Sequence, residues 1–185
     1  MTELSRALLR LVEELESAEI PYGLIGGLAV AAWGEPRSTL DVDVTVWTEA
    51  DQTSVLVQRL TSVFLARSAN PVAFVRDRGV LPLEFEGVRL DVVFARLPFE
   101  RDIIERAAKR EVAGRMVNVI AVEDLVLMKM ISEREKDLDD ARKLIRRFGS
   151  SLDVGYLEPR LVEITEALAI PDRLALFRKE LKNKT

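Results

Sequence analysis

The chain has 185 residues, of which 48% are apolar and 31% charged, and its formal net charge is −4. This size and apolar content predict one folded domain with a real core and a small helical appendage, and they exclude disordered and collagen-like chains. The sequence contains neither cysteine nor histidine, which excludes disulfides, Ser-His-Asp triads and metal sites built on thiolate or imidazole. Catalysis must therefore use carboxylates, lysine, arginine, hydroxyls or the backbone, and any metal should be a hard cation held by oxygen.

The beginning of the chain does not resemble a targeting segment, because Glu3, Arg6 and Arg10 stand where a leader would be apolar. The longest uncharged run, residues 20–34, contains a proline and several glycines and is too short to span a bilayer. We therefore expect a cytoplasmic protein with no membrane partner. The mildly acidic charge argues against broad nonspecific nucleic-acid binding but leaves room for a local basic patch.

The first two thirds of the sequence mix predicted helices and strands. Leucines at helical spacing predict an amphipathic helix over 3–17, and Pro21 ends it. The pattern then predicts, in order, a strand over 22–25, a short helix over 28–33, a strand over 41–47, a helix from the capping-box pattern at 48–51 to about 67, a hairpin of 81–85 with 88–94, a helix over 99–109 and strands over 111–113 and 115–120.

From residue 123 onward the sequence predicts helices alone, over 123–134, 137–148, 154–168 and 172–181. The expected fold class is therefore α+β, with a small mixed sheet flanked by helices and followed by a C-terminal helical bundle. We expect the boundary between a core at 1–121 and a helical subdomain at 122–185.

Two acids in the predicted strand over 41–47 carry the strongest local signal. Asp41 and Asp43 are two residues apart, so both carboxylates should project from the same face of the strand. Like charges at this spacing repel one another, and a divalent cation gives a reason for them. Mg²⁺ prefers one or two carboxylates together with substrate phosphates. The alternative is an exposed strand edge without function.

Asp91 is a lone carboxylate within a second apolar strand. If this strand lies beside the strand of Asp41 and Asp43, three carboxylates converge, as in sites for nucleotidyl transfer. A hydrogen-bonded aspartate at a strand end explains Asp91 equally well. Gly26 and Gly27 follow a strand and precede a helix, where glycines let the backbone approach a phosphate, although a tight turn needs small residues too.

Lys129 is the single charge in the apolar run 125–131 of a predicted helix. Such a helix should be largely buried, and a buried ammonium needs an anionic partner. A triphosphate is one candidate partner, and Asp137 or Asp140 is another. A lysine whose stem merely covers apolar surface is the third explanation.

Two basic features are candidates for binding phosphate. Arg37 lies in the loop before Asp41, where it could clamp a phosphate or pair with an acid. A basic run on the helix over 137–148 could receive an RNA backbone, although most such runs are solvated surface; it comprises Arg142, Lys143, Arg146 and Arg147.

These motifs, taken in order, resemble the signature of the nucleotidyltransferase superfamily, which shares its catalytic fold with DNA polymerase β and the lincosamide and aminoglycoside nucleotidyltransferases. The signature consists of Ile25-Gly26-Gly27, then Asp41-Val42-Asp43, and later Leu90-Asp91-Val92. The segments 36–43, 123–129 and 134–140 further resemble the AbiEii branch, which contains type IV toxins and the related MenT toxins. The resemblance covers roughly residues 22–147.

The resemblance implies a role for each motif. Metal binding, with Mg²⁺ or Mn²⁺ as the ion, would fall to Asp41, Asp43 and Asp91, and Asp91 would also activate the acceptor hydroxyl. Nucleotide phosphates would meet Gly26, Gly27, Arg37 and Lys129, and Asp137 matches an acid that the toxin branch carries in its last motif. Position 27 departs from the many relatives that carry serine there, so one hydroxyl is missing.

The sequence thus predicts an enzyme, a nucleotidyltransferase that moves a nucleoside monophosphate from an NTP to an acceptor hydroxyl. In the toxin-like version the acceptor is RNA, such as a tRNA end, and a cognate antitoxin protein restrains the enzyme. One alternative is an adenylyltransferase that modifies an antibiotic and has an acidic acceptor pocket. The other is a catalytically silent module, which the presence of Asp41, Asp43 and Lys129 disfavours.

Overall fold

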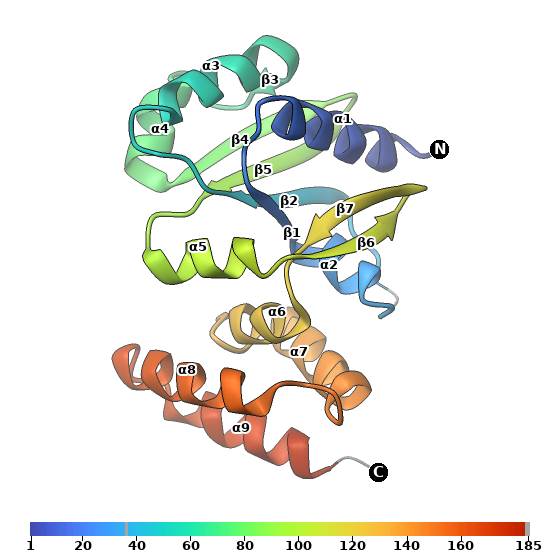
Figure 1. The fold of residues 1–185 in the computed structure, drawn as a ribbon, viewed down its shortest axis with the longest axis vertical. Coiled ribbons are helices and arrows are strands. Elements are labelled where there is room, and N and C mark those ends of the chain that lie inside the picture. Colours follow the sequence, from blue (N-terminus) through green and yellow to red (C-terminus); the bar gives the residue numbers. More distant parts are fainter. Residues whose placement is uncertain (36, 184–185) are drawn as a thin grey trace. The chain divides into compact units, whose positions relative to one another are not determined.

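The structure is a computed structural model that describes residues 1–35 and 37–183. These residues form two compact units. The first contains Met1–Ala32 and residues 37–120. The second contains Trp33–Glu35 together with the described residues from Ala121 onward. The sheet belongs to the first unit, and the second unit is helical (Figure 1).

The first unit is built on one mixed sheet with the strand order β3-β4-β5-β2-β1-β7-β6. The central strand β2 runs antiparallel to β1 and parallel to β5, and the remaining pairs are antiparallel except β1 with β7. The strands are β1 (Tyr22–Ile25), β2 (Asp41–Val46), β3 (Leu65–Ala66), β4 (Val80–Phe85), β5 (Val88–Phe94), β6 (Ala108–Val112) and β7 (Arg115–Val119).

Helices lie on both faces of this sheet, with α1, α3 and α4 on one side and α5 on the other (Figure 1). The helices of the unit are α1 (Glu3–Ser17), α2 (Gly26–Ala32), α3 (Thr53–Val63), α4 (Pro71–Arg78) and α5 (Pro98–Glu105). The apolar stripe of α1 is fully buried, as are the alternate strand residues Val42, Val44, Leu90 and Val92. Burial of these side chains is the main stabilising term for the unit.

The second unit contains α6 (Val122–Met130), α7 (Glu135–Phe148), α8 (Val154–Ala167) and α9 (Pro171–Lys182). The core of the unit contains buried leucines of α6, α7 and α8 together with Phe177 of α9, which is fully buried. The α+β fold class and the C-terminal helices are therefore as the sequence predicts. In the described part of the chain, no helix combines the length and the apolar character that crossing a membrane requires.

The predicted capping box at 48–51 is wrong. The Thr48 hydroxyl is hydrogen-bonded to the Thr53 hydroxyl at 2.9 Å, and α3 begins at Thr53 without a side-chain cap. The helix also ends at Val63 rather than near 67, because the chain from Phe64 is extended and leads into β3. The sequence analysis missed α4, which starts with an Asn70 side-chain cap and Pro71 in its first turn.

Two other helices end earlier than predicted. Helix α5 ends at Glu105, and residues 108–112 form β6 instead, because they pair with β7 along their whole length. Helix α6 ends at Met130, and Arg134 becomes the residue before the first turn of α7. Helix α2 differs in the other direction and begins at Gly26, two residues before the predicted start.

Candidate active site

Asp43 lies at the centre of the first unit's sheet, between β1 and β5. In the register of the strands it is the direct partner of Ile25 on β1 and of Asp91 on β5. Side chains of directly opposed residues leave a sheet on the same face. Asp41, two residues earlier on β2, shares that face and is exposed, whereas Asp43 and Asp91 are half-buried. The three predicted acids therefore occupy one face of two adjacent strands.

The turn that follows β1 lies against the Asp43 carboxylate. Gly26 has a φ of +67°, and an ideal Cβ on it would stand 2.0 Å from Asp43 Oδ2. Only glycine combines this left-handed backbone with the absence of a side chain that would overlap the acid. The glycine turn and the first acid motif, which are separate in the sequence, are thus one site.

Gly27 is packed against the loop that precedes β2. An ideal Cβ on Gly27 would stand 2.8 Å from the Thr39 Cβ, 2.9 Å from its Oγ1 and 3.2 Å from Arg37 Nε. Thr39 Oγ1 also donates a hydrogen bond of 2.6 Å to Asp41 Oδ1. The structure therefore places Gly26, Gly27 and Arg37 beside the acids, but not Lys129, and Thr39 is an addition that the sequence analysis missed.

The negative charges of the acids favour a bound cation, but the acids alone do not provide a complete set of metal ligands. Burial raises the pKa of Asp91 above its ordinary value, and the Asp41 charge adds to this, while Arg67 and Arg89 oppose it. Among the described residues, no group of three or more acidic side chains is arranged to hold a metal ion as it stands. The donors are nevertheless hard carboxylate oxygens, and Mg²⁺ takes only one or two of these when phosphates supply the rest.

Arg67 and Arg89 lie on the same sheet face as the acids and were not singled out by the sequence analysis. Arg89 is the register partner of Asp41, and the Arg67 backbone N–H donates to the Pro82 carbonyl next to Asp91's strand. Both arginines are exposed. The alternation Arg89-Leu90-Asp91 was the signal that could have found Arg89, since residues two apart in a strand share a face.

Lys129 is buried in the second unit in an ion-pair cluster. Its ammonium pairs with Asp137 and lies 3.3 Å from Asp140 Oδ2, and its side chain is 7% exposed. Ser132 Oγ and Arg134 Nε donate to the other oxygen of Asp137, at 2.8 and 2.6 Å. Although burial opposes it, the hydrogen bonds from Lys129 and Ser132 lower the pKa of Asp137 to about 2. The sequence left several candidate partners for Lys129 open, and the structure shows that it pairs with the aspartates.

The predicted basic run on α7 is largely neutralised. Arg142 pairs with Glu135 and Asp139, Arg146 pairs with Glu180, and Arg147 pairs with Glu35. Arginines that already have carboxylate partners offer less charge to an RNA backbone than the sequence suggests.

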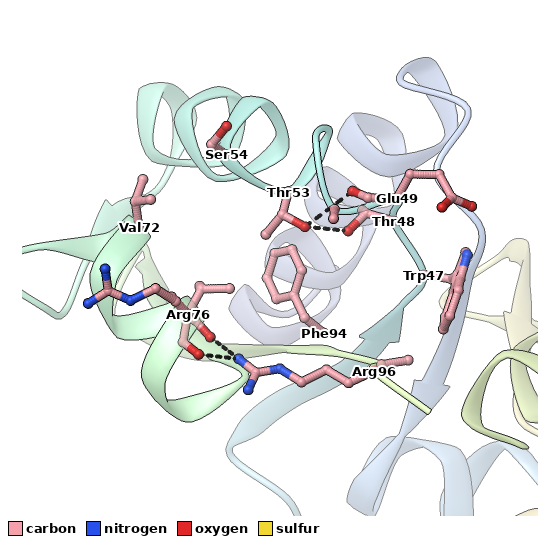
Figure 2. A pocket seen from close by; sticks show the side chains of 12 residues that line it. Trp47, Thr48, Glu49, Thr53, Ser54, Val72, Arg76, Phe94 and Arg96 are labelled. Carbon is pink, nitrogen blue, oxygen red and sulfur yellow. Dashed lines mark hydrogen bonds between the residues drawn. The ribbon is translucent and has the colours of Figure 1, made fainter. Parts of the chain in front are cut away.

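A pocket of about 590 Å³ lies at the other end of β2 and β5 and contains none of the predicted site residues. Figure 2 shows Phe94 in its wall and Arg96 reaching toward the end of α4. The Arg96 guanidinium donates to the carbonyls of Val75 and Arg76 and so caps α4. The acids, rather than this pocket, carry the chemistry that the sequence predicts.

Comparisons with known proteins bear on the family and on the fold. The model of a family described as "Nucleotidyltransferase of unknown function (DUF6036)" matches residues 3–175. A search of the curated proteins finds no match.

Solved structures share the fold. The antibiotic-resistance factor ANT(2'')-Ia has a TM-score of 0.62 and 15% identity, over 89% of this chain and 94% of its own. The lincomycin-bound lincosamide antibiotic adenylyltransferase LnuA has a TM-score of 0.54 and 18% identity, over 78% of this chain and 96% of its own. An antigenic nucleotidyltransferase-like protein from Paracoccidioides brasiliensis has a TM-score of 0.54 and 21% identity, over 98% and 93%. At such identities the likeness concerns the fold alone.

Proposed function

Because the chain belongs to the family of nucleotidyltransferases of unknown function (DUF6036), we propose that it transfers a nucleoside monophosphate from an NTP to an acceptor hydroxyl. The observation that carries the proposal is the register of Asp43 with Asp91, beside a glycine turn that leaves no room for a side chain. This arrangement joins acids for a cation to backbone that can approach a phosphate.

In the proposed reaction the acceptor oxygen attacks the α-phosphorus of the NTP. A new P–O bond forms while the bond from the α-phosphorus to the bridging oxygen breaks, and pyrophosphate leaves. Asp91 takes the proton of the attacking hydroxyl, a role that suits a carboxylate whose pKa is raised by burial.

Mg²⁺ would be held by Asp43 with Asp41 and Asp91, and when bound it would neutralise charge on the phosphates. Mn²⁺ would fit the same oxygen donors. Gly26 and Gly27 would admit the phosphates close to the backbone, and Arg37 would pair with them. The roles that the family resemblance gives to Lys129 and Asp137 stay predictions.

The proposed acceptor is an RNA hydroxyl, such as a tRNA end, in a toxin that a separate antitoxin restrains. Its support is the ordered set of motifs that resembles the AbiEii branch. An antibiotic hydroxyl is the alternative acceptor, and for cationic antibiotics it requires an acidic acceptor side. The exposed arginines beside Asp91 weigh against that alternative.

The test is incubation of the purified protein with Mg²⁺, each α-labelled NTP in turn, and total tRNA. The Asp41→Ala/Asp43→Ala variant is the control. Label that moves to RNA with the wild type alone supports the toxin-like proposal. Metal-dependent NTP binding without transfer to RNA would redirect the search to a small-molecule acceptor. The absence of both transfer and binding would contradict the enzyme and leave a silent module.

A further inference from the structure

The two arginines on the acid-bearing face of the sheet have no counter-ion in the described part of the chain. Neither Arg67 nor Arg89 forms an ion pair there, although six other arginines of the first unit do. Glu84 is the register partner of Arg89 across β4 and β5, yet it pairs with neither arginine. Exposed guanidinium groups in this state are good ligands for an anion.

The strand register places both arginines beside Asp91 on the acid-bearing face of the sheet. The Arg67 backbone N–H donates to the carbonyl of Pro82, which is the direct register partner of Asp91. Arg89 is two residues before Asp91 on β5, and Arg67 follows β3, two strands away. Arg89 therefore shares the strand and the face of Asp91, and Arg67 lies on the β3–β4 side of it.

The glycine turn lies on the opposite side of the acids. It follows β1, which flanks β2 on the edge away from β5. In-line displacement at phosphorus places the leaving group and the attacking oxygen on opposite sides of the reacting centre. If the NTP phosphates occupy the glycine-turn side, the acceptor must approach from the side of Asp91, Arg67 and Arg89.

We propose that Arg67 and Arg89 form an anion site that holds a phosphate group of the acceptor and so positions its hydroxyl at Asp91. This inference rests on the proposed nucleotidyl transfer. A cationic acceptor would meet two like charges at this place, whereas a phosphate gains two charge-assisted hydrogen-bonding partners. The phosphate belongs either to an RNA backbone or to a free nucleotide, and the arms of the test distinguish these sources.

The test measures binding without NTP and in EDTA, so that it does not depend on catalysis. One arm titrates a fluorescein-labelled single-stranded RNA of 20 nucleotides, and the other titrates adenosine 5′-monophosphate. The variant is Arg67→Gln/Arg89→Gln. The matched control is Arg76→Gln/Arg78→Gln, which removes the same charge from the exposed face of α4. Thermal melting confirms that both variants fold.

We expect the Arg67→Gln/Arg89→Gln variant to bind RNA at least about tenfold more weakly than the control. The slope of log affinity against log salt should fall by about 1.4 for two lost phosphate contacts to a single strand. A loss confined to the nucleotide arm would support the same site with a free nucleotide as its ligand. Equal binding by variant and control, or binding of neither probe by the wild type, would overturn the inference. Mg²⁺-dependent NTP binding, measured separately, reports on the proposed function itself.

Discussion

Gly26 and Asp43 are in such close contact that an ideal Cβ on Gly26 would stand 2.0 Å from the Asp43 Oδ2 atom. The contact links the turn after β1 to the central acid on β2. Because Gly26 also has a φ of +67°, two separate requirements exclude other residues from this position. The geometry of the acid therefore depends on a residue that has no side chain.

Gly26→Ala should displace the Asp43 carboxylate and abolish Mg²⁺-dependent NTP binding. A positive φ alone costs about 1–3 kcal/mol for a residue with a side chain, so stability would fall as well. Gly87→Ala is the matched control, because Gly87 has a φ of +78° but an added Cβ would meet nothing within 4 Å. Isothermal titration with NTP measures the effect of the overlap between the added Cβ and Asp43. Thermal melting measures the cost of the backbone strain, which both variants share. NTP binding by Gly26→Ala as tight as that of Gly87→Ala would show that the contact is unimportant.

Asp91→Asn should stabilise the protein in EDTA while weakening its response to Mg²⁺. Burial and the charge of Asp41 raise the Asp91 pKa, so the ionised form is disfavoured in the fold at neutral pH, and the neutral amide relieves this. Because Asp91 is only half-buried, solvent screening keeps this gain below about 1 kcal/mol, which corresponds to at most roughly 2–4 °C for a chain of this length.

The exposed Asp51→Asn change is the control for charge removal in general. Melting curves with and without Mg²⁺ provide the measurement, since a bound ligand raises the melting temperature. A loss of stability in EDTA would rule out the cost of burying the Asp91 charge, and an undiminished Mg²⁺ response would rule out its role in metal binding.

The acids and the glycine turn could be predicted because their chemistry is local. The spacing of Asp41 and Asp43 already places both on one strand face, and Gly26-Gly27 follows a recognisable strand. Their contact partners could not be predicted, because the register that sets Asp43 opposite Asp91 joins segments far apart in the chain.

The helices show a similar division between local and long-range signals. The signal for α4 was present in Asn70-Pro71, a capping residue followed by the residue preferred in a first turn. The pairing of Arg146 with Glu180 and Arg147 with Glu35 was not visible, because neither partner is close in sequence. For Lys129 the sequence left a triphosphate and the aspartates open as candidate partners, and only the packing of α6 against α7 shows the aspartates.

Lys129→Met should destabilise the second unit by about 3–5 kcal/mol. The change removes the positive charge from two buried carboxylates and leaves them without compensation. Lys143→Met on α7 is the control, because this lysine is exposed and such changes cost within about 0.5 kcal/mol. Urea denaturation measures both. If the two variants unfolded at the same urea concentration, the cluster would not hold α6 and α7 together.

Acid should weaken the protein through Asp137. Its folded-state pKa of about 2 lies below the ordinary value of 3.8, so the unfolded chain takes up the proton first as the pH falls. The stabilisation is thus complete above about pH 4 and is lost as the pH falls toward 2. Asp137→Asn should be less stable at neutral pH and show a flatter decline over this window. Parallel pH profiles for the two proteins in denaturation experiments would contradict the assignment.

The measurement closest to the central claim is isothermal titration of the protein with each of the four NTPs, with Mg²⁺ and with EDTA, for the wild type and Asp43→Asn. We predict that at least one NTP binds with Mg²⁺, that EDTA removes this binding, and that Asp43→Asn removes it while remaining folded. NTP binding that depends on neither the metal nor Asp43 would contradict an active site built on these acids.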